Sequence, residues 1–229
     1  MSDRGTREQR RQAFEAVDLY PVTDQEQSRG RSDLEVLEGL IAGGAKIVQL
    51  REKRLSKRGL FSLAAAFRER TARAGMLLII NDHLDIALAC GADGVHLGQD
   101  DLPLPEARRL APQLLIGASS HNLEEALAAQ DQGADYVNIG PIFPTRTKEL
   151  SILPLGPGAI AETGPRLQVP FTVMGGINRA NIGAVLEAGA RRVAVVTAVT
   201  LAPDIPGAVR ELRGLIRKAA GAGRDESSG

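Results

Sequence analysis

Short apolar runs alternate with longer amphipathic segments along most of the 229-residue chain. The apolar runs predict strands near 16–23, 46–51, 76–80, 93–97, 114–119, 135–139, 170–174 and 192–197. Segments in which apolar residues recur with the period of a helix predict helices near 32–43, 57–74, 83–90, 103–111, 122–132, 157–163, 179–188 and 205–218. This alternation of strand and helix favours a parallel sheet with helices packed outside it.

A repeated phrase marks the ends of several predicted helices. It is GGAK at 43–46, CGAD at 90–93, QGAD at 132–135 and AGAR at 188–191. Each phrase places a glycine where a helix ends in the left-handed conformation and the chain turns back toward the sheet. No change in composition divides the units, so we expect one α/β domain over 16–218, a closed (β/α)8 TIM barrel. A doubly wound open sheet is the alternative, but no GxGxxG motif follows the first strand.

Composition limits the core and the partners of this barrel. Aromatic residues make up 3% of the chain and tryptophan is absent, so we expect a core of aliphatic side chains and alanine. Lysine plus arginine and aspartate plus glutamate each total 28, and the resulting zero net charge argues against a nucleic-acid partner. The single cysteine excludes an internal disulfide and is consistent with a reducing compartment.

The chain carries no signal for a membrane or for export. No run approaches the roughly 20 apolar residues of a membrane span. The charged N-terminus is not followed by the apolar stretch of a secretory signal. We therefore expect a cytoplasmic protein with no membrane partner, in which residues 1–15 and 219–229 form disordered tails.

Polar residues gather where the second strand ends, at the edge that carries active sites in this fold. Because side chains alternate along a strand, Gln49, Arg51 and Lys53 share one face, which we expect to line the barrel. Two inward cations favour an anionic ligand there. A salt-bridged rim, for instance with Glu52, is the alternative.

Two carboxylates follow the neighbouring strands. The third strand ends in Asn81-Asp82, and Asp101 follows the fourth. Consecutive strands are neighbours in a barrel, so the two carboxylates are expected close together. Mg²⁺ takes one or two carboxylates and completes its shell with water and phosphate oxygens, which predicts a magnesium site on a diphosphate. The alternative for Asp82 is a cap on the following helix.

Further candidate ligand-binding residues lie farther along the chain, and those after strands seven and eight predict a second, metal-free phosphate site. After the fifth strand, Ser120 fits a helix cap, which leaves Ser119 free to bind a ligand. A long loop follows the sixth strand, and loops of this length are often functional. Gly176 follows the seventh strand and Val196-Thr197 end the eighth, where backbone N–H groups can approach a phosphate.

Taken together, these segments resemble the thiamine-phosphate synthase family. The stretches that carry the resemblance are LYPVTD (19–24), VQLREK (48–53), INDHLDIALACGADGVHLGQDDLP (80–103), IGASSHNLEEA (116–126), ADYVNIGPIFPTRTK (134–148), MGGI (174–177) and VAVVTAV (193–199). HLGQDD and GPIFPTRTK are highly specific, whereas LREK and GGI are shared with relatives. The departures are His83, Asn138 and Thr197, where many members have arginine, glycine and serine.

The resemblance implies a transferase of thiamine biosynthesis that joins hydroxymethylpyrimidine diphosphate to hydroxyethylthiazole phosphate and releases pyrophosphate, with Mg²⁺ as cofactor. Its two substrates are phosphorylated small molecules, and a homo-oligomer is possible. Carried over by motif, the residues for the pyrimidine diphosphate are Gln49, Arg51, Lys53, Asn81, Ser119 and Lys148. The magnesium ligands are Asp82 and Asp101. The residues for the thiazole phosphate are Thr145, Thr147, Gly176, Val196 and Thr197, and Arg146 of the same loop joins the substrate-binding set.

The family chemistry is dissociative, so no protein nucleophile is expected. The resemblance gives the catalytic roles to Arg51, Lys53, Lys148 and Ser119, and the three cations with Mg²⁺ stabilise the departing pyrophosphate. Two alternatives stay open. One is a thiazole tautomerase-like isomerase, and the other is a non-catalytic sensor of a phosphorylated ligand on the same barrel.

Overall fold

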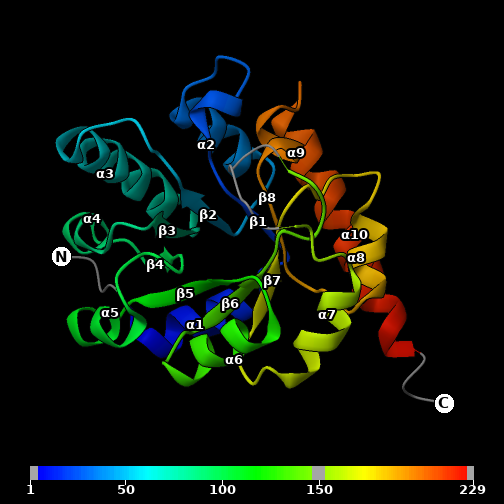
Figure 1. Ribbon diagram of the computed structural model, residues 1–229. Coiled ribbons are helices and arrows are strands. Elements are labelled where there is room, and N and C mark those ends of the chain that lie inside the picture. Colours follow the sequence, from blue (N-terminus) through cyan, green and yellow to red (C-terminus); the bar gives the residue numbers. More distant parts are fainter. Residues whose placement is uncertain (1–4, 146–152, 226–229) are drawn as a thin grey trace.

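Eight parallel strands form a nearly closed ring in the computed structural model, which describes residues 5–145 and 153–225 (Figure 1). The strands are β1 (Leu19–Pro21), β2 (Ile47–Leu50), β3 (Leu77–Asn81), β4 (Gly94–Leu97), β5 (Leu115–Ser120), β6 (Tyr136–Ile139), β7 (Phe171–Val173) and β8 (Val193–Val195). They pair in the order β1-β8-β7-β6-β5-β4-β3-β2. A parallel bridge between Val22 and Gln49 brings β1 back to β2, so the predicted barrel is confirmed.

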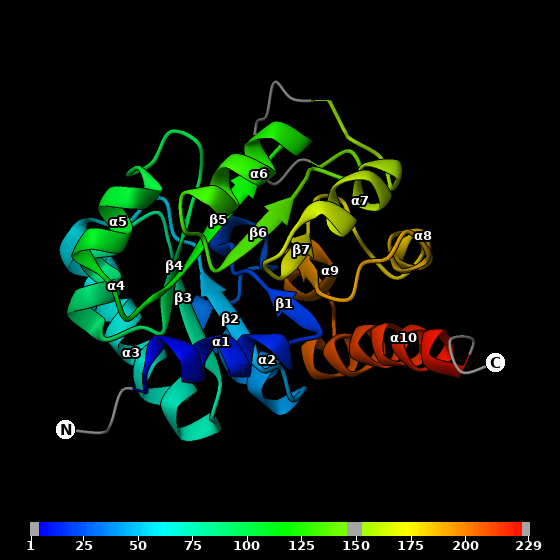
Figure 2. The ribbon, with the colours of Figure 1, turned by 90° about the horizontal axis from the view of Figure 1, so that it is seen from below.

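Helices surround this ring, and the N-terminal helix lies across one end of it (Figure 2). They are α1 (Arg7–Glu15), α2 (Asp33–Ala42), α3 (Lys57–Ala74), α4 (Leu84–Cys90), α5 (Leu104–Leu110), α6 (Leu123–Asp131), α7 (Gly158–Thr163), α8 (Ile182–Glu187), α9 (Thr197–Thr200) and α10 (Ile205–Asp225), with 3-10 turns η1 (Gln25–Gln27) and η2 (Gly164–Arg166). Within the described ranges, none of these helices is both long and apolar enough to cross a membrane.

The repeated helix-ending phrase has the predicted geometry. Its glycines adopt the left-handed backbone conformation, with φ of 81°, 70°, 91° and 103° at Gly44, Gly91, Gly133 and Gly189. A side chain is disfavoured at such angles, which explains the glycine in each phrase.

The interior of the barrel differs from the expected aliphatic core. The shell between sheet and helices is almost entirely aliphatic, as at Val48 and Leu50. Inside the ring, however, Gly94 and Gly117 carry no side chain, and the rings of Tyr20 and Tyr136 fill the space. A β-carbon on Gly117 would overlap the ring of Tyr136. The chain's only two tyrosines therefore lie in the barrel interior, a placement that composition did not reveal.

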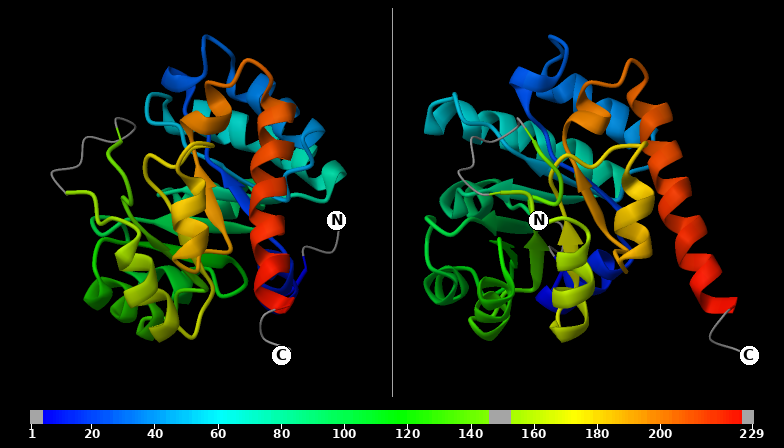
Figure 3. Two further views of the ribbon diagram at one scale, coloured as in Figure 1. Left: turned by 90° about the vertical axis from the view of Figure 1, so that its right-hand side faces the viewer. Right: turned by 45° about the vertical axis from the view of Figure 1, so that its right-hand side comes forward.

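Residues 7–15 are helical, so the expectation of disorder over 1–15 is wrong for this part. Thr6 and Gln9 form a reciprocal capping box at the start of α1. At its other end Phe14 is 1% exposed and stacks on Tyr136, with ring centroids 4.3 Å apart. The helix lies across the end of the barrel where the strands begin (Figure 3). One buried aromatic ring and a cap thus order a segment whose remaining residues are mostly polar.

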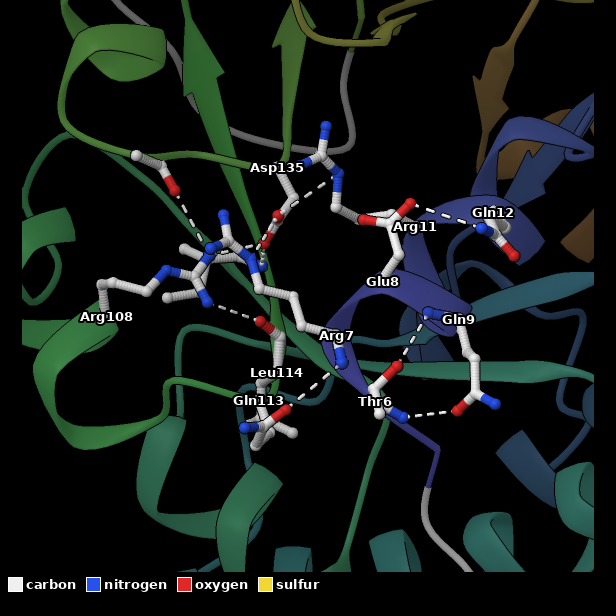
Figure 4. A network of polar contacts seen from close by, with 12 residues as sticks. Thr6, Arg7, Glu8, Gln9, Arg11, Gln12, Arg108, Gln113, Leu114 and Asp135 are labelled. Atoms are coloured by element: carbon white, nitrogen blue, oxygen red, sulfur yellow. Dashed lines mark hydrogen bonds and ion pairs between the residues drawn. The ribbon is translucent and has the colours of Figure 1, made fainter.

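Arginines hold α1 to the barrel through a buried carboxylate (Figure 4). The side chain of Asp135 is 1% exposed and accepts hydrogen bonds from Arg7 Nε at 2.8 Å and from the guanidinium of Arg108. It also accepts the backbone N–H of Ile116 at 2.8 Å. Because a buried charge needs partners, this site fixes the helix to β5 and β6.

The last helix is longer than the sequence indicated. We expected it to end at 218 with a disordered tail over 219–229, but α10 continues through Asp225. Adding residues to a helix that already exists costs little, and alanines 219 and 220 favour continuation.

Candidate active site

A cavity of about 340 Å³ opens where the strands end, within the usual size range of small-molecule sites. Every predicted site residue that the structure describes lines it: Gln49, Arg51, Lys53, Asn81, Asp82, Asp101, Ser119, Thr145, Gly176, Val196 and Thr197. Three further predicted residues, Arg146, Thr147 and Lys148, lie outside the described residues. The ends of β2 to β8 and the loops that follow them thus bring the predicted residues to a single cavity.

The carboxyl groups of Asp82 and Asp101 are neighbours, and each affects the ionisation of the other. Burial raises the pKa of Asp101 and the adjacent Asp82 raises it further, although the Gly98 N–H donates to Asp101 Oδ2 at 2.7 Å. Burial also opposes ionisation of Asp82, but hydrogen bonds with Lys53 and Asp101 outweigh it, so the pKa of Asp82 is lowered. Two carboxyl groups this close repel each other when both are ionised, unless a cation lies between them.

This pair fits a magnesium ion. Mg²⁺ needs one or two carboxylates and takes its remaining ligands from water and phosphate. Among residues 5–145 and 153–225 no group of three or more acidic, histidine or cysteine side chains converges as a complete metal cage. Two carboxylates are the number that a protein usually supplies to Mg²⁺.

The backbone at Asp82 is in an unusual conformation. Its φ of 61° is left-handed, which costs a residue with a side chain roughly 1–2 kcal/mol. The Asp82 N–H donates to the carbonyl of His96 at 2.8 Å, which ties the turn to β4. The cap residue of α4 is His83, without a side-chain cap bond, so the alternative of Asp82 as a helix cap is wrong. Such strain often marks a functional site.

Both cations at the end of β2 have carboxylate partners. Arg51 donates to Asp24 Oδ2 at 2.7 Å, and Lys53 pairs with Asp82. The alternative of a salt-bridged rim is thus confirmed in that both cations are ion-paired, but Glu52, its suggested partner, accepts backbone N–H groups of Arg54 and Leu55 instead. Arg51 and Lys53 therefore line the cavity with their positions fixed by neighbouring carboxylates.

Ser119 lies at the cavity and Ser120 points away from it. The hydroxyl of Ser120 is buried and donates to the carbonyl of Asn138 at 3.0 Å. The cap of α6 is Asn122, whose side chain accepts the Glu125 N–H at 2.8 Å. The expectation that Ser120 caps this helix is wrong, because the true cap lies two residues later.

The wall formed by the loops after β6, β7 and β8 is rich in glycine and hydroxyl groups. Gly175 and Gly176 have φ of 107° and 63°, and a β-carbon on Gly176 would overlap the carbonyl of Pro144. Only glycine therefore lets the loop after β7 pack against the loop that leads to Thr145. Thr197 opens the short helix α9 directly after β8 and carries a hydroxyl at the same cavity.

Several residues at or below the cavity were not predicted. His96 is 7% exposed and lines the cavity from β4, and Tyr20 and Tyr136 lie below it. Asp24 holds Arg51. Asn138, noted only as a departure, accepts a hydrogen bond from Thr172 at 2.9 Å.

Of these residues, only His96 could have been found from the sequence, because side-chain alternation along β4 places it inward. No signal in the sequence distinguished Tyr20 and Tyr136, because inward-facing tyrosines are also ordinary core residues.

Comparisons with known proteins agree with this architecture. The family model described as thiamine monophosphate synthase matches residues 19–199. The thiamine-phosphate synthase of Chloroflexus aurantiacus is 49% identical over 198 residues, which cover 86% of this chain and 92% of that protein. The thiamine-phosphate synthase of Shouchella clausii is 44% identical over 202 residues, covering 88% and 97%.

A solved structure shows the same relation in three dimensions. Thiamine phosphate pyrophosphorylase from Pyrococcus furiosus superposes with a TM-score of 0.82 at 34% sequence identity, covering 89% of this chain and 96% of that one. The match of model, sequence and structure extends over nearly the whole barrel. The chain therefore belongs to the thiamine monophosphate synthase family.

Proposed function

We propose that the chain condenses 4-amino-2-methyl-5-(diphosphooxymethyl)pyrimidine with 4-methyl-5-(2-phosphooxyethyl)thiazole, giving thiamine phosphate and pyrophosphate. This is the activity for which its close relatives are named. The observation that carries the proposal is one cavity with two unlike walls. A carboxylate pair with two cations lies over β2, β3 and β4, and glycines and hydroxyls lie across the ring over β7 and β8.

The first wall suits the diphosphate. Asp82 and Asp101 would hold Mg²⁺, which neutralises part of the charge on the leaving group when it is bound. Arg51 and Lys53 lie beside this pair and supply fixed positive charge, and we assign Lys148 the same role. Gln49, Asn81 and Ser119 line the cavity next to them, and we assign them to the pyrimidine end of the same substrate.

The second wall suits the thiazole phosphate, a monophosphate that needs no metal. Gly176 and Val196 offer backbone close to the cavity, and Thr145 and Thr197 offer hydroxyl donors. Thr147 and Arg146 belong to the same proposed set. Holding the thiazole here places it across the cavity from the diphosphate, so the two substrates are oriented for reaction.

The reaction then needs no nucleophile from the protein. The bond between the pyrimidine methylene carbon and the diphosphate oxygen breaks, and the electron pair leaves with pyrophosphate. The thiazole nitrogen donates its lone pair to the resulting carbocation and forms the new bond. The chain's part is to stabilise the growing negative charge, to position both substrates and to exclude water.

The two alternative functions each leave part of the candidate active site unexplained. A thiazole tautomerase-like isomerase requires neither a diphosphate nor its metal, so it leaves the Asp82–Asp101 pair unexplained. A phosphate-ligand sensor needs only one anion site, whereas two walls face this cavity. A cytoplasmic location and a homo-oligomeric state stay predictions.

The test is pyrophosphate release from the two precursors, with and without Mg²⁺. We expect wild-type activity to require Mg²⁺, and Asp101→Ala to lower turnover by on the order of 10²–10³, as for other preorganised charges. Asp85→Ala is the control, since Asp85 is an exposed carboxylate on α4 that pairs with Lys57. Turnover of Asp101→Ala near that of the control would overturn the assignment, and ligand binding without turnover by the wild type would favour the sensor.

A further inference from the structure

A continuous chain of hydrogen bonds crosses the barrel interior from β2 to β5. Gln49 Nε2 donates to the Tyr20 hydroxyl at 3.0 Å, and the hydroxyl oxygens of Tyr20 and Tyr136 are 2.9 Å apart. The Tyr136 hydroxyl is 3.1 Å from His96 Nδ1, and His96 Nε2 is 3.0 Å from Ser119 Oγ. Its end residues, Gln49 and Ser119, both line the cavity. Two residues that line the candidate active site from β2 and β5 are thus connected beneath its floor.

With the Gln49 amide nitrogen donating to Tyr20, as it does here, the hydrogens along this chain have one order that satisfies its buried groups. Among the described residues, the Tyr20 hydroxyl contacts only Gln49 and Tyr136. Because Gln49 donates to Tyr20, the Tyr20 hydrogen has only the Tyr136 oxygen to go to, and a buried donor needs an acceptor. Burial raises the pKa of both tyrosines, so both hydroxyls keep their hydrogens.

The same order continues to Ser119. The Tyr136 hydroxyl hydrogen is donated to His96 Nδ1, so the ring hydrogen of the neutral imidazole is on Nε2. His96 Nε2–H then donates to Ser119 Oγ, which leaves the Ser119 hydroxyl hydrogen free to point into the cavity. If the Gln49 amide were reversed, every bond in the chain would reverse, and the Ser119 hydrogen would be donated to His96 instead.

We propose that His96 is a positioning residue, held in its Nε2–H tautomer by the Tyr20–Tyr136 pair, which makes Ser119 a hydrogen-bond donor to the bound ligand. The ligand in question is the pyrimidine diphosphate, so this part rests on the proposed function. The chain also couples two groups of the pyrimidine subsite: Gln49 presents its carbonyl oxygen to the cavity only while Ser119 presents its hydrogen.

If Tyr136 served only to pack the barrel interior, its aromatic ring would suffice and its hydroxyl would not be needed. Phe14 stacks on the ring of Tyr136 and Gly117 makes room for it, and neither contact involves the hydroxyl. Tyr136→Phe keeps both contacts and removes the link between Tyr20 and His96. The variant therefore separates positioning from packing.

The kinetic test compares this substitution in two backgrounds. In the wild-type background we expect Tyr136→Phe to lower kcat about tenfold, the effect of one hydrogen bond worth about 1.4 kcal/mol. In a Ser119→Ala background the same substitution should change nothing further, because the group that His96 positions is gone. An equal fall in both backgrounds would overturn the proposal. Thr71→Val, which removes a buried hydroxyl on α3, is the control and should keep wild-type turnover.

A second readout needs no substrate. The chain has three histidines, and heteronuclear NMR of the imidazole nitrogens, assigned by the signals lost in His96→Gln, gives the tautomer of His96. We expect the hydrogen on Nε2 in the wild type and a mixture of tautomers in Tyr136→Phe. A wild-type ring with its hydrogen on Nδ1 would overturn the proposal. Failure of the proposed function would appear differently, as an inactive wild type whose His96 tautomer is still the expected one.

Discussion

At the scale of single residues, Asp33 at the start of α2 is a buried carboxyl group whose ionised form is unfavourable. It is 3% exposed, and its Oδ1 is buried without a hydrogen-bond partner among the described residues. Burial raises its pKa from 3.8 to about 6, and the nearby carboxylates of Glu52 and Asp24 add to the increase. Since Asp24 also holds Arg51, this acidic group lies directly behind the cavity.

Asp33→Asn should stabilise the protein at neutral pH. The folded-state pKa exceeds the unfolded value of 3.8, so the folded state holds the proton more tightly and stability falls as pH rises from 3.8 through about 6. At about 1.4 kcal/mol per pH unit, the ionised carboxylate costs about 3 kcal/mol at neutral pH. The stability gained by Asp33→Asn should therefore vanish below about pH 4, where the wild-type carboxyl group is protonated in both the folded and the unfolded state.

Urea unfolding of wild type and variant across this pH range measures the effect. The control is Asp131→Asn, which removes the same formal charge from an exposed position at the end of α6. A wild-type stability that does not decline between these pH values, or a variant that declines equally, would contradict the cause given for the shift.

At the scale of elements, α1 is joined to the barrel by one aromatic ring and one ionic cluster. Phe14 contacts Tyr136 and Tyr20 from below, and Arg192 lies over its other side, 5.9 Å from the ring centroid. Arg7 and Arg108 meet at Asp135 (Figure 4). The helix thus closes the end of the barrel opposite the candidate active site.

Phe14→Ala should destabilise the fold by about 3–5 kcal/mol, because it removes a large buried ring and leaves a cavity. Phe61→Ala on α3 is the matched control, since Phe61 is 40% exposed and its loss should cost no more than about 0.5 kcal/mol. Denaturant unfolding measures both. Equal costs for the two variants would show that α1 contributes little to the barrel.

The features that could be predicted from the sequence depend on the local alternation of side chains along each strand. Side-chain alternation placed Gln49 and Arg51 at the cavity, and their neighbours Val48 and Leu50 pack outward as expected. The ordering of α1 was not predictable in this way, because it depends on a contact between Phe14 and Tyr136, far apart in the chain. Pairings such as Arg51 with Asp24 also depend on how separate loops meet, which no spacing encodes.

At the scale of the whole molecule, the barrel interior is filled by few, large side chains. One inward position on each of β4 and β5 is a glycine: Ile79 and Leu115 occupy the volume beside Gly94, and the ring of Tyr136 occupies the volume beside Gly117. The interior therefore cannot gain volume at Gly117 without displacing the Tyr136 ring, whose hydroxyl belongs to the hydrogen-bond chain.

Gly117→Ala should destabilise the protein by about 1–3 kcal/mol or more, because the new β-carbon would overlap the ring of Tyr136. Gly183→Ala is the control, and we expect it to raise stability. Gly183 lies within α8 with open space beside it, so alanine there should add about 0.5–1 kcal/mol through helix propensity. Thermal unfolding of both variants tests the difference, and a neutral Gly117→Ala would contradict the tight packing.

The placement of both tyrosines in the lumen, in a chain without tryptophan, has a spectroscopic consequence. Nearly all intrinsic near-ultraviolet absorbance and fluorescence of the protein must originate between the plug formed by α1 and the floor of the cavity. The molecule thus carries a built-in optical probe of its own interior, with no label and no surface background.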